Sequence, residues 1–197
     1  MGEKMNKKTL ILVAAVLVFG IVSIVSGIGT MMNAGSGGVQ YKKYSSAEYG
    51  FSVNYPQNWV ERTGVPGAAV YCNAPPLKLT STSSWNDPAS FNVQIPAPAG
   101  GMTLNQLVDE SKLAVKNMFP GISLTDEKDI QVNGMTGHEW MFIVDNYSGS
   151  GMSATGRQDL FIANDKVYVI TFAAMSDYYH SNYAGTFDAI LNSFTVP

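Results

Sequence analysis

Apolar and polar residues alternate along several short stretches of this chain, and this pattern predicts β-strands. Phe51, Val53 and Tyr55 occupy every second position, so they share one face of a strand. The same alternation recurs over Ser90 to Ile95, and a shorter apolar run covers Ala68 to Cys72. Proline residues follow all three stretches and end the predicted strands.

Two β-hairpins are predicted in the second half of the chain. Asn133-Gly134 is a strong signal for a two-residue turn, because both residues tolerate a positive φ angle. It joins a strand over Ile130 to Val132 to a return strand over His138 to Val144. One face of the return strand carries Trp140, Phe142 and Val144. The second hairpin consists of Gln158 to Ala163, a turn at Asn164-Asp165, and Val167 to Ala174.

Apolar side chains with a period of 3.6 residues predict a helix that begins after Thr103. Thr103 and Gln106 have the spacing of a capping box, and Pro120-Gly121 ends the helix. One face of this helix is expected to pack on a sheet. That face consists of Leu104, Leu107, Val108, Ser111, Ala114, Val115 and Met118.

A second helix is predicted from about Asp177 to Phe194. Its largely aromatic stripe recurs at helical spacing, which favours core packing over the alternative of a ligand-lining groove. The stripe consists of Tyr179, Tyr183, Phe187, Ile190 and Phe194. Strands, a helix, antiparallel strands and a final helix, in this order, predict an α+β fold with helices covering an antiparallel sheet.

The segment from Leu10 to Gly29 has no charged residue and is long enough to cross a bilayer as a helix. Lys4, Lys7 and Lys8 precede it, so the basic end is expected in the cytoplasm and the remaining chain outside it. We therefore predict a single-pass protein of the cell membrane with an extracytoplasmic domain. The alternative is a cleaved signal peptide, whose apolar region is usually shorter, roughly 7 to 15 residues.

These features divide the chain into four parts. They are a cytoplasmic basic stub over residues 1–9, a transmembrane anchor or signal-anchor over 10–32, a flexible linker over 33–43 and a folded domain over 44–197. Without the charges of the stub, the chain's 12 basic and 15 acidic residues leave a net charge of −5, which argues against a nucleic-acid partner. The single cysteine, Cys72, is expected in the core, with an intermolecular disulfide as the alternative.

Residues with catalytic or metal-binding potential are few. His138 and His180 are the two histidines, and neither has a second histidine or a cysteine at metal-ligand spacing. The chain has no G-x-S-x-G motif, which would place a serine nucleophile on a sharp turn. Asp126-Glu-Lys-Asp129 is interpreted as a solvated turn and not as a calcium loop, because it lacks the regular acidic spacing and the glycine. The sequence therefore predicts no catalytic residue, metal site or cofactor.

Four segments share a pattern of aromatic and glycine residues. The first, Phe51-Ser-Val-Asn-Tyr-Pro-Gln-Asn-Trp59, reads F-x-V-x-Y-P-x-x-W. The others are Val132-Asn-Gly134 with Gly137-His-Glu-Trp140, then Val167-Tyr-Val-Ile-Thr-Phe172, and finally Tyr183 through Phe187 to Ile190-Leu-Asn-Ser-Phe194. Together they resemble the PsbP-like family, whose fold is shared with the small Ran-binding Mog proteins, over nearly all of Tyr44 to Pro197.

The resemblance implies an α/β/α sandwich around a central antiparallel sheet. It also implies a non-enzymatic role, because members of this fold are mostly accessory subunits of photosystem II, binders of a small GTPase, or exported lipoproteins. The chain differs from the photosynthetic members, since a membrane anchor replaces their long transit peptide and no metal-binding residue can be carried over. In this respect it resembles the anchored prokaryotic members, bacterial or archaeal.

Two functional hypotheses follow from the sequence. The first is a membrane-tethered, extracytoplasmic, non-catalytic binding or accessory module that contacts another envelope or membrane protein. The second is a small-ligand enzyme or hydrolase whose site is assembled from dispersed residues. The dispersed residues are His138, Glu139, Asp159 and His180.

The loop from Tyr147 to Gly156 is rich in glycine and serine and is the candidate contact surface, because binding residues concentrate on loops over a rigid scaffold. The candidate contact residues are Tyr147, Ser148, Met152 and Thr155. A passive hairpin connection is the alternative for this loop. Asn146-Tyr-Ser148 is also a glycosylation sequon, although such triplets arise by chance.

Overall fold

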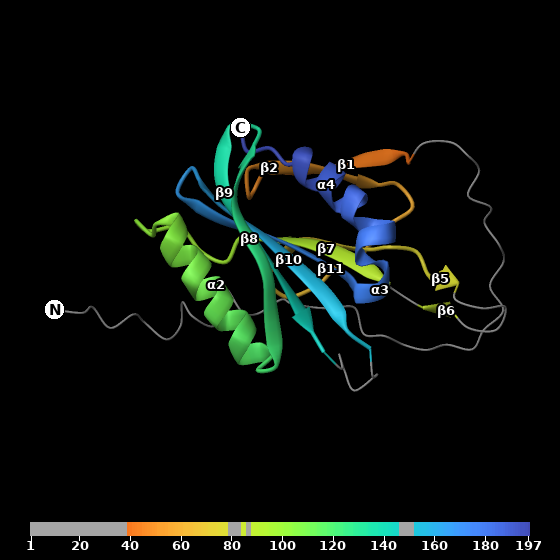
Figure 1. Ribbon diagram of the computed structural model, residues 1–197. Coiled ribbons are helices and arrows are strands. Elements are labelled where there is room, and N and C mark those ends of the chain that lie inside the picture. The colour runs from red at the N-terminus through yellow and green to blue at the C-terminus, as the bar shows by residue number, and fades with distance from the viewer. Residues whose placement is uncertain (1–38, 79–83, 86–87, 146–151) are drawn as a thin grey trace.

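The computed structural model describes residues 39–78, 84–85, 88–145 and 152–197. Its centre is a seven-stranded antiparallel sheet with the strand order β3-β4-β7-β11-β10-β9-β8 (Figure 1). These strands are β3 (Val60–Glu61), β4 (Ala68–Asn73), β7 (Ala89–Gln94), β8 (Ile122–Val132), β9 (Met135–Val144), β10 (Ala154–Ala163) and β11 (Lys166–Met175). Two smaller sheets pair β1 (Tyr41–Ser46) with β2 (Phe51–Pro56), and β5 (Leu77–Lys78) with β6 (Ser84–Trp85).

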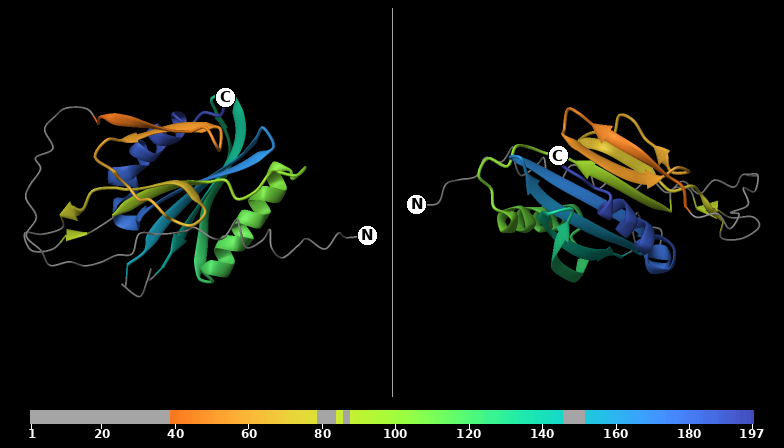
Figure 2. Two further views of the ribbon diagram at one scale, coloured as in Figure 1. Left: turned by 180° about the vertical axis from the view of Figure 1, so that it is seen from behind. Right: turned by 90° about the horizontal axis from the view of Figure 1, so that it is seen from above.

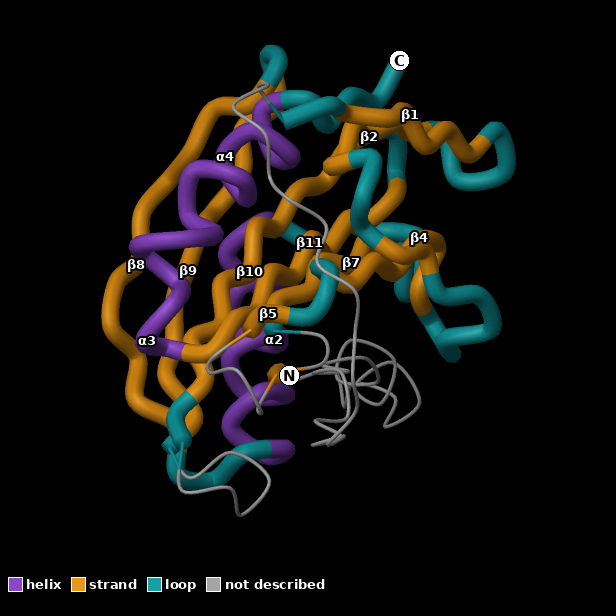
Figure 3. Tube along the Cα trace, turned by 90° about the vertical axis from the view of Figure 1, so that its right-hand side faces the viewer, coloured by secondary structure: helices purple, strands orange, loops and turns teal. Residues whose placement is uncertain are grey.

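Helices cover both faces of the central sheet (Figure 2). Helix α2 (Leu104–Met118) packs on β9 and β10 from one side. The other side is covered by the β1–β2 hairpin and by a C-terminal helical stretch. This stretch consists of α3 (Ser176–Tyr178), the π-helical segment η2 (Tyr179–Tyr183) and α4 (Ala184–Asn192). Helix α4 lies beside the β1–β2 hairpin (Figure 3). An antiparallel sheet with helices is therefore confirmed.

Aromatic side chains fill the layer between the sheet and the C-terminal helices. The ring centroid of Phe187 lies 4.8 Å from that of Phe172 on β11 and 6.2 Å from that of Trp59. Phe194 stacks on Phe161 of β10 at 5.9 Å. Among the predicted stripe residues, Tyr179, Phe187, Ile190 and Phe194 are buried and Tyr183 is half-buried. Core packing is therefore the role of this stripe.

The C-terminal helix differs from the predicted one in its geometry. A single regular helix was predicted, whereas Tyr179–Tyr183 form a π-helical turn and α4 ends at Asn192. Phe194 consequently enters the core from the segment behind the helix. Its carbonyl oxygen accepts a hydrogen bond of 2.8 Å from Nδ2 of Asn133, which fixes that segment against the β8–β9 turn.

Helix α2 begins with the predicted capping box. The Oγ1 atom of Thr103 accepts a hydrogen bond from the backbone N–H of Gln106, and the Gln106 side chain accepts one from the backbone N–H of Thr103. The buried face consists of Leu107, Val108, Ser111, Ala114 and Val115. The prediction that Met118 faces the core is wrong, because the buried residues of the helix end at Val115 and Met118 is 39% exposed.

Both predicted two-residue turns are confirmed. The turn between β8 and β9 has positive φ angles at Asn133 and Gly134, of 48° and 83°. The turn between β10 and β11 has φ angles of 50° at Asn164 and 56° at Asp165. Left-handed turns of this kind match the right-handed twist of the strands that they join. They fix the register of the four strands that carry the candidate site.

Strand β8 is longer than predicted. Asp126-Glu-Lys-Asp129 was interpreted as a solvated turn, and this prediction is wrong, because the segment pairs with β9 as part of Ile122–Val132. The sequence gives no alternating apolar signal here, since most side chains of the strand are exposed and many are charged. A bulge between Leu124 and Asp126 interrupts its pairing with β9.

The described fold starts earlier than the predicted domain. Residues 41–43, assigned to the linker from the sequence, form the first half of β1, and Tyr41 pairs with Pro56. The predicted stub and transmembrane segment lie outside the described residues. Within the described ranges, no helix is long and apolar enough to span a membrane. Cys72 is fully buried in the core, as predicted.

Candidate functional site

Strand β8 lies at one edge of the central sheet and presents charged side chains to both faces. Its register with β9 places Lys128 opposite Glu139, and Glu127 opposite Trp140. Successive side chains of a strand point to opposite faces. Lys128 therefore belongs to the face beneath the C-terminal helices, and Glu127 belongs to the face beneath α2.

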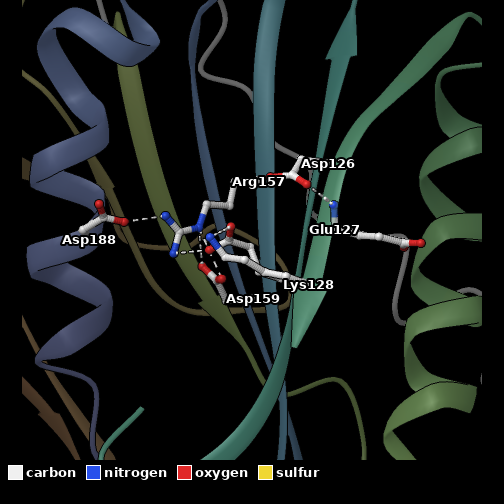
Figure 4. Close-up of polar contacts among 7 residues, drawn as sticks. Asp126, Glu127, Lys128, Arg157, Asp159 and Asp188 are labelled. Atoms are coloured by element: carbon white, nitrogen blue, oxygen red, sulfur yellow. Dashed lines mark hydrogen bonds and ion pairs between the residues drawn. The ribbon is translucent and has the colours of Figure 1, made fainter. Parts of the chain in front are cut away.

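Arg157 is the centre of a buried ion cluster on the first of these faces (Figure 4). Its Nη2 atom lies 2.7 Å from Oε2 of Glu139, its Nη1 donates to Oδ1 of Asp188 over 2.7 Å, and its Nε donates to Oδ2 of Asp159 over 3.0 Å. Lys128 Nζ lies 2.9 Å from Oε1 of Glu139. The cluster thus joins three adjacent strands to helix α4.

Three members of this cluster lie where water is largely excluded, whereas the side chains of Lys128 and Asp188 are more than half exposed. Glu139, Arg157 and Asp159 are 4%, 6% and 0% exposed. Burial raises the pKa of Asp159 to about 8; Arg157 opposes this shift and Glu139 adds to it. Burial also disfavours the charge of Arg157, but the carboxylates of Asp159, Asp188 and Glu139 outweigh it and raise the pKa of Arg157 above its ordinary value. Arg157 is therefore a permanent buried cation.

A second polar network lies on the α2 side of the same edge and is more open to water. Glu127 forms an ion pair with Lys112 of α2 and lies 3.7 Å from Nε2 of His138. The Nδ1 atom of His138 lies 2.9 Å from Oδ1 of Asp129. The hydrogen bond and charge of Lys112 lower the pKa of Glu127. This network fastens α2 to β8.

A small cavity of about 230 Å³ opens between α2 and β8 beside this network. Its lining consists of Lys112, Leu124, Thr125, Asp126, Glu127 and Trp140. The indole Nε1 of Trp140 is buried and has no hydrogen-bond partner among the described residues. Lys112 is paired with Glu127, so the cavity combines the apolar side chains of Leu124 and Trp140 with one ion pair and the additional carboxyl group of Asp126.

The predicted contact loop is described only in part. Asn146, Tyr147 and Ser148 lie outside the described residues, so the sequon and the first two contact residues stay predictions. Met152 is half-buried just before β10. Thr155 is 5% exposed inside β10, and its Oγ1 lies 2.9 Å from Oγ of Ser176. Of these residues, Thr155 is therefore held inside the domain.

The four dispersed residues of the enzyme hypothesis do not form one constellation. Glu139 and Asp159 lie opposite each other on β9 and β10, inside the buried ion cluster. His138 is next to Glu139 in the chain, so its side chain points to the other face. His180 is exposed on η2. Within the described part, no three His, Cys, Asp or Glu side chains are placed to hold a metal ion.

Sequence reasoning missed Arg157, Lys128 and Asp188. One signal for Arg157 was present, because Arg157 and Asp159 are two residues apart on a predicted strand and so share a face. Lys128 was hidden in the segment interpreted as a turn. Asp188 stands in a helix whose aromatic stripe dominated the pattern, and its partner is 31 residues away in the chain.

The solved structures to which this chain is similar share its fold at low sequence identity. The cyanobacterial PsbP protein CyanoP from Synechocystis sp. PCC 6803 is 16% identical, with a TM-score of 0.58 over 85% of this chain and 98% of that one. The Ran-binding protein Mog1p of Saccharomyces cerevisiae is 10% identical, with a TM-score of 0.53 over 80% and 96%. LpqN of Mycobacterium tuberculosis, described as involved in cell envelope biogenesis, is 12% identical, with a TM-score of 0.52 over 82% and 93%.

The sequence itself matches a family model over almost its whole length. No curated protein matches the chain. The model described as "PsbP-like protein" matches residues 9–196, which include all of the described fold. This agrees with the antiparallel sheet, the helices on its faces and the three structures of the same fold. The chain belongs to the PsbP-like protein family.

Proposed function

We propose that this protein is a membrane-tethered, extracytoplasmic binding or accessory module without catalytic activity. The observation that supports it most is the match to the PsbP-like family over residues 9–196, which includes both the described domain and the apolar segment with the length and composition of an anchor. A tethered domain with a glycine- and serine-containing linker can search the space near the membrane for its partner.

The arrangement of the polar side chains supports a role without chemistry. The carboxyl groups of Glu139 and Asp159 are engaged with Arg157 in a region closed to water, so they are not presented to a substrate. The side chain of His138 lies on the other face of the sheet, and His180 is exposed on η2. A catalytic acid–base pair needs its members within hydrogen-bond reach of one reacting group.

The partner in this proposal is another protein of the envelope or membrane. Two proteins with this fold, the Ran-binding protein Mog1p and LpqN, which is involved in cell envelope biogenesis, are consistent with a protein-contact role and with an envelope setting. Similarity to these proteins at such low sequence identity shows a shared fold and not a shared partner. We infer the class of partner from the predicted position of the domain outside the cytoplasm. The contact surface is the end of the sheet where β9 and β10 lead into the predicted loop.

Site-specific photo-cross-linking tests this proposal. A photoreactive residue at Ser148 of the full-length protein, expressed in its native membrane, is expected to capture one specific envelope protein. The matched control places the same residue at Leu113, which is 48% exposed on α2. Equal capture from both positions, or capture from neither, would contradict the assigned contact surface.

Two further measurements test the remaining parts of the proposal. Protease added to intact spheroplasts should digest the domain and spare a tag placed before Met5; the opposite pattern would overturn the orientation. Turnover of esterase, phosphatase, peptidase or glycosidase substrates is not expected. Activity that is abolished by His138→Ala or His180→Ala in a folded protein would favour the enzyme hypothesis instead.

A further inference from the structure

The buried ion cluster contains more negative than positive groups. Its buried groups are the carboxyls of Glu139 and Asp159 and one cation, Arg157, whereas the side chains of Lys128 and Asp188 are 57% and 58% exposed. If Glu139, Asp159 and Arg157 were all ionised, these buried groups would have a net negative charge in a place where charges are poorly solvated. One bound proton restores neutrality, and the free-energy penalty of an unbalanced buried charge favours that proton.

The contacts show which carboxyl group is best suited to bind the proton. Glu139 lies within 2.9 Å of two cations, since Lys128 contacts one of its oxygens and Arg157 the other. The Asp188 side chain is 58% exposed, so water solvates its charge. Asp159 is 0% exposed, has the Nε atom of Arg157 as its cation contact among the described residues, and lies opposite Glu139 in the strand register. Asp159 is the carboxyl group with the least compensation.

We propose that Asp159 is protonated in the folded protein at neutral pH and that its ionisation in mildly alkaline surroundings loosens helix α4 from the sheet. The domain would in this way respond to the pH outside the cytoplasm. The inference concerns the cluster alone and holds whatever partner the module contacts.

The elements packed around Asp159 present both charged and neutral groups. Strand β8 presents Lys128, β9 presents Glu139, and the segment η2 presents the Tyr179 hydroxyl, which has no hydrogen-bond partner among the described residues. Helix α4 presents Asp188, and β11 presents the uncharged ring of Phe172, whose centroid lies 5.5 Å from the Arg157 guanidinium carbon. Arg157 is therefore the cation that compensates the negative charge of Asp159 when Asp159 is ionised.

The direction of the pH effect follows from these surroundings. Burial raises the pKa of Asp159 from its ordinary value of 3.8 to about 8 in the folded protein. A carboxyl group with a raised folded pKa contributes stability that is fully present below its unfolded pKa and is lost as the pH rises through the folded pKa. The loss should be complete above about pH 8. The pKa of Tyr179 is itself raised by burial, so its hydroxyl stays neutral in this range.

Ionisation of Asp159 should act first on the contact with helix α4. When Asp159 is ionised, a second buried carboxylate lies beside Glu139. Both carboxylates then attract the Arg157 guanidinium towards the sheet, because neither is solvated by water. Asp188 can exchange its ion pair for water, since its side chain is largely exposed. The Arg157–Asp188 link is therefore the contact that weakens.

Infrared spectroscopy of the full-length protein in detergent micelles tests the protonation directly. A carboxylic acid has a C=O stretching band that a carboxylate lacks. We expect the wild type to show this band at about pH 7 and to lose it by about pH 10. The variant Asp159→Asn should show neither the band nor its loss. The matched control, Asp109→Asn on the exposed face of α2, should behave as the wild type does. A wild-type spectrum that is unchanged between the two pH values would overturn the proposal.

Hydrogen–deuterium exchange tests the loosening of the helix. After correction for the chemical effect of pH on exchange, amides of Ala184–Asn192 should exchange at least several-fold faster at about pH 9.5 than at about pH 7 in the wild type, and not in Asp159→Asn. If Asp159→Asn does not fold, Glu139→Gln serves instead. Removing that neighbouring anion should shift the loss of the infrared band to lower pH, and an unshifted band would contradict the proposal.

Discussion

The guanidinium Nη1 of Arg157 donates a hydrogen bond to Oδ1 of Asp188 over 2.7 Å and so connects strand β10 to helix α4. The same guanidinium contacts Glu139 and Asp159 on the sheet. One side chain therefore fixes the C-terminal helix and contacts two buried carboxyl groups at the same time. Substitutions at this position should affect stability far more than substitutions at other basic residues.

Arg157→Met should destabilise the domain by about 3–5 kcal/mol, because it removes one of the two cations that contact the buried Glu139 carboxylate and the hydrogen bonds to Asp159 and Asp188. The measurement is the urea-unfolding midpoint of the full-length protein in detergent. Lys116→Met, at an exposed position of α2, is the matched control and should change the free energy of unfolding by less than about 0.5 kcal/mol. Equal effects of the two substitutions would contradict the structural role of the buried ion cluster.

Gly156→Ala and Gly185→Ala should change stability in opposite directions. A Cβ atom at Gly156 would lie 2.3 Å from the Phe142 ring, which is 0% exposed and cannot move away freely. Gly185 lies in helix α4, and a Cβ atom at this position would have no other atom within 4 Å. We expect Gly156→Ala to lower the melting temperature, and Gly185→Ala to raise stability by roughly 0.5–1 kcal/mol through the better helix propensity of alanine. A Gly156→Ala variant as stable as the wild type would contradict the close contact between Gly156 and the Phe142 ring.

Phe187→Ala should cost about 3–5 kcal/mol, because the ring is fully buried among Trp59, Phe172 and Tyr179. Leu113→Ala removes an apolar side chain from the exposed side of α2 and serves as the control. Thermal unfolding followed by circular dichroism distinguishes the two. An unshifted transition for Phe187→Ala would mean that α4 does not pack on the sheet through this residue.

Thr103→Ala should lower stability by about 1 kcal/mol, since the first turn of α2 loses the hydroxyl that accepts from the Gln106 N–H. Thr103→Ser keeps that oxygen and should recover most of the loss. Chemical denaturation measures both variants. Equal losses for alanine and serine would indicate that the methyl group, and not the cap, matters at this position.

Local physics allowed the sequence to determine much of this fold. The capping box at Thr103, the left-handed turns at Asn133-Gly134 and Asn164-Asp165, and the alternation of Phe51, Val53 and Tyr55 depend on residues close together in the chain. Their energies are set by neighbouring backbone groups or by a single buried face. For that reason these elements were predicted correctly without knowledge of the tertiary structure.

Only the tertiary structure decided how the charged residues are used. Asp126-Glu-Lys-Asp129 lacks an apolar pattern and becomes a strand because β9 supplies its hydrogen bonds. Arg157 and Asp188 meet because the helix folds back over the sheet, and neither residue signals the other in the sequence. The free energy of a buried charge depends on its partners in space, so the role of the cluster was fixed by packing and could not be read from order along the chain.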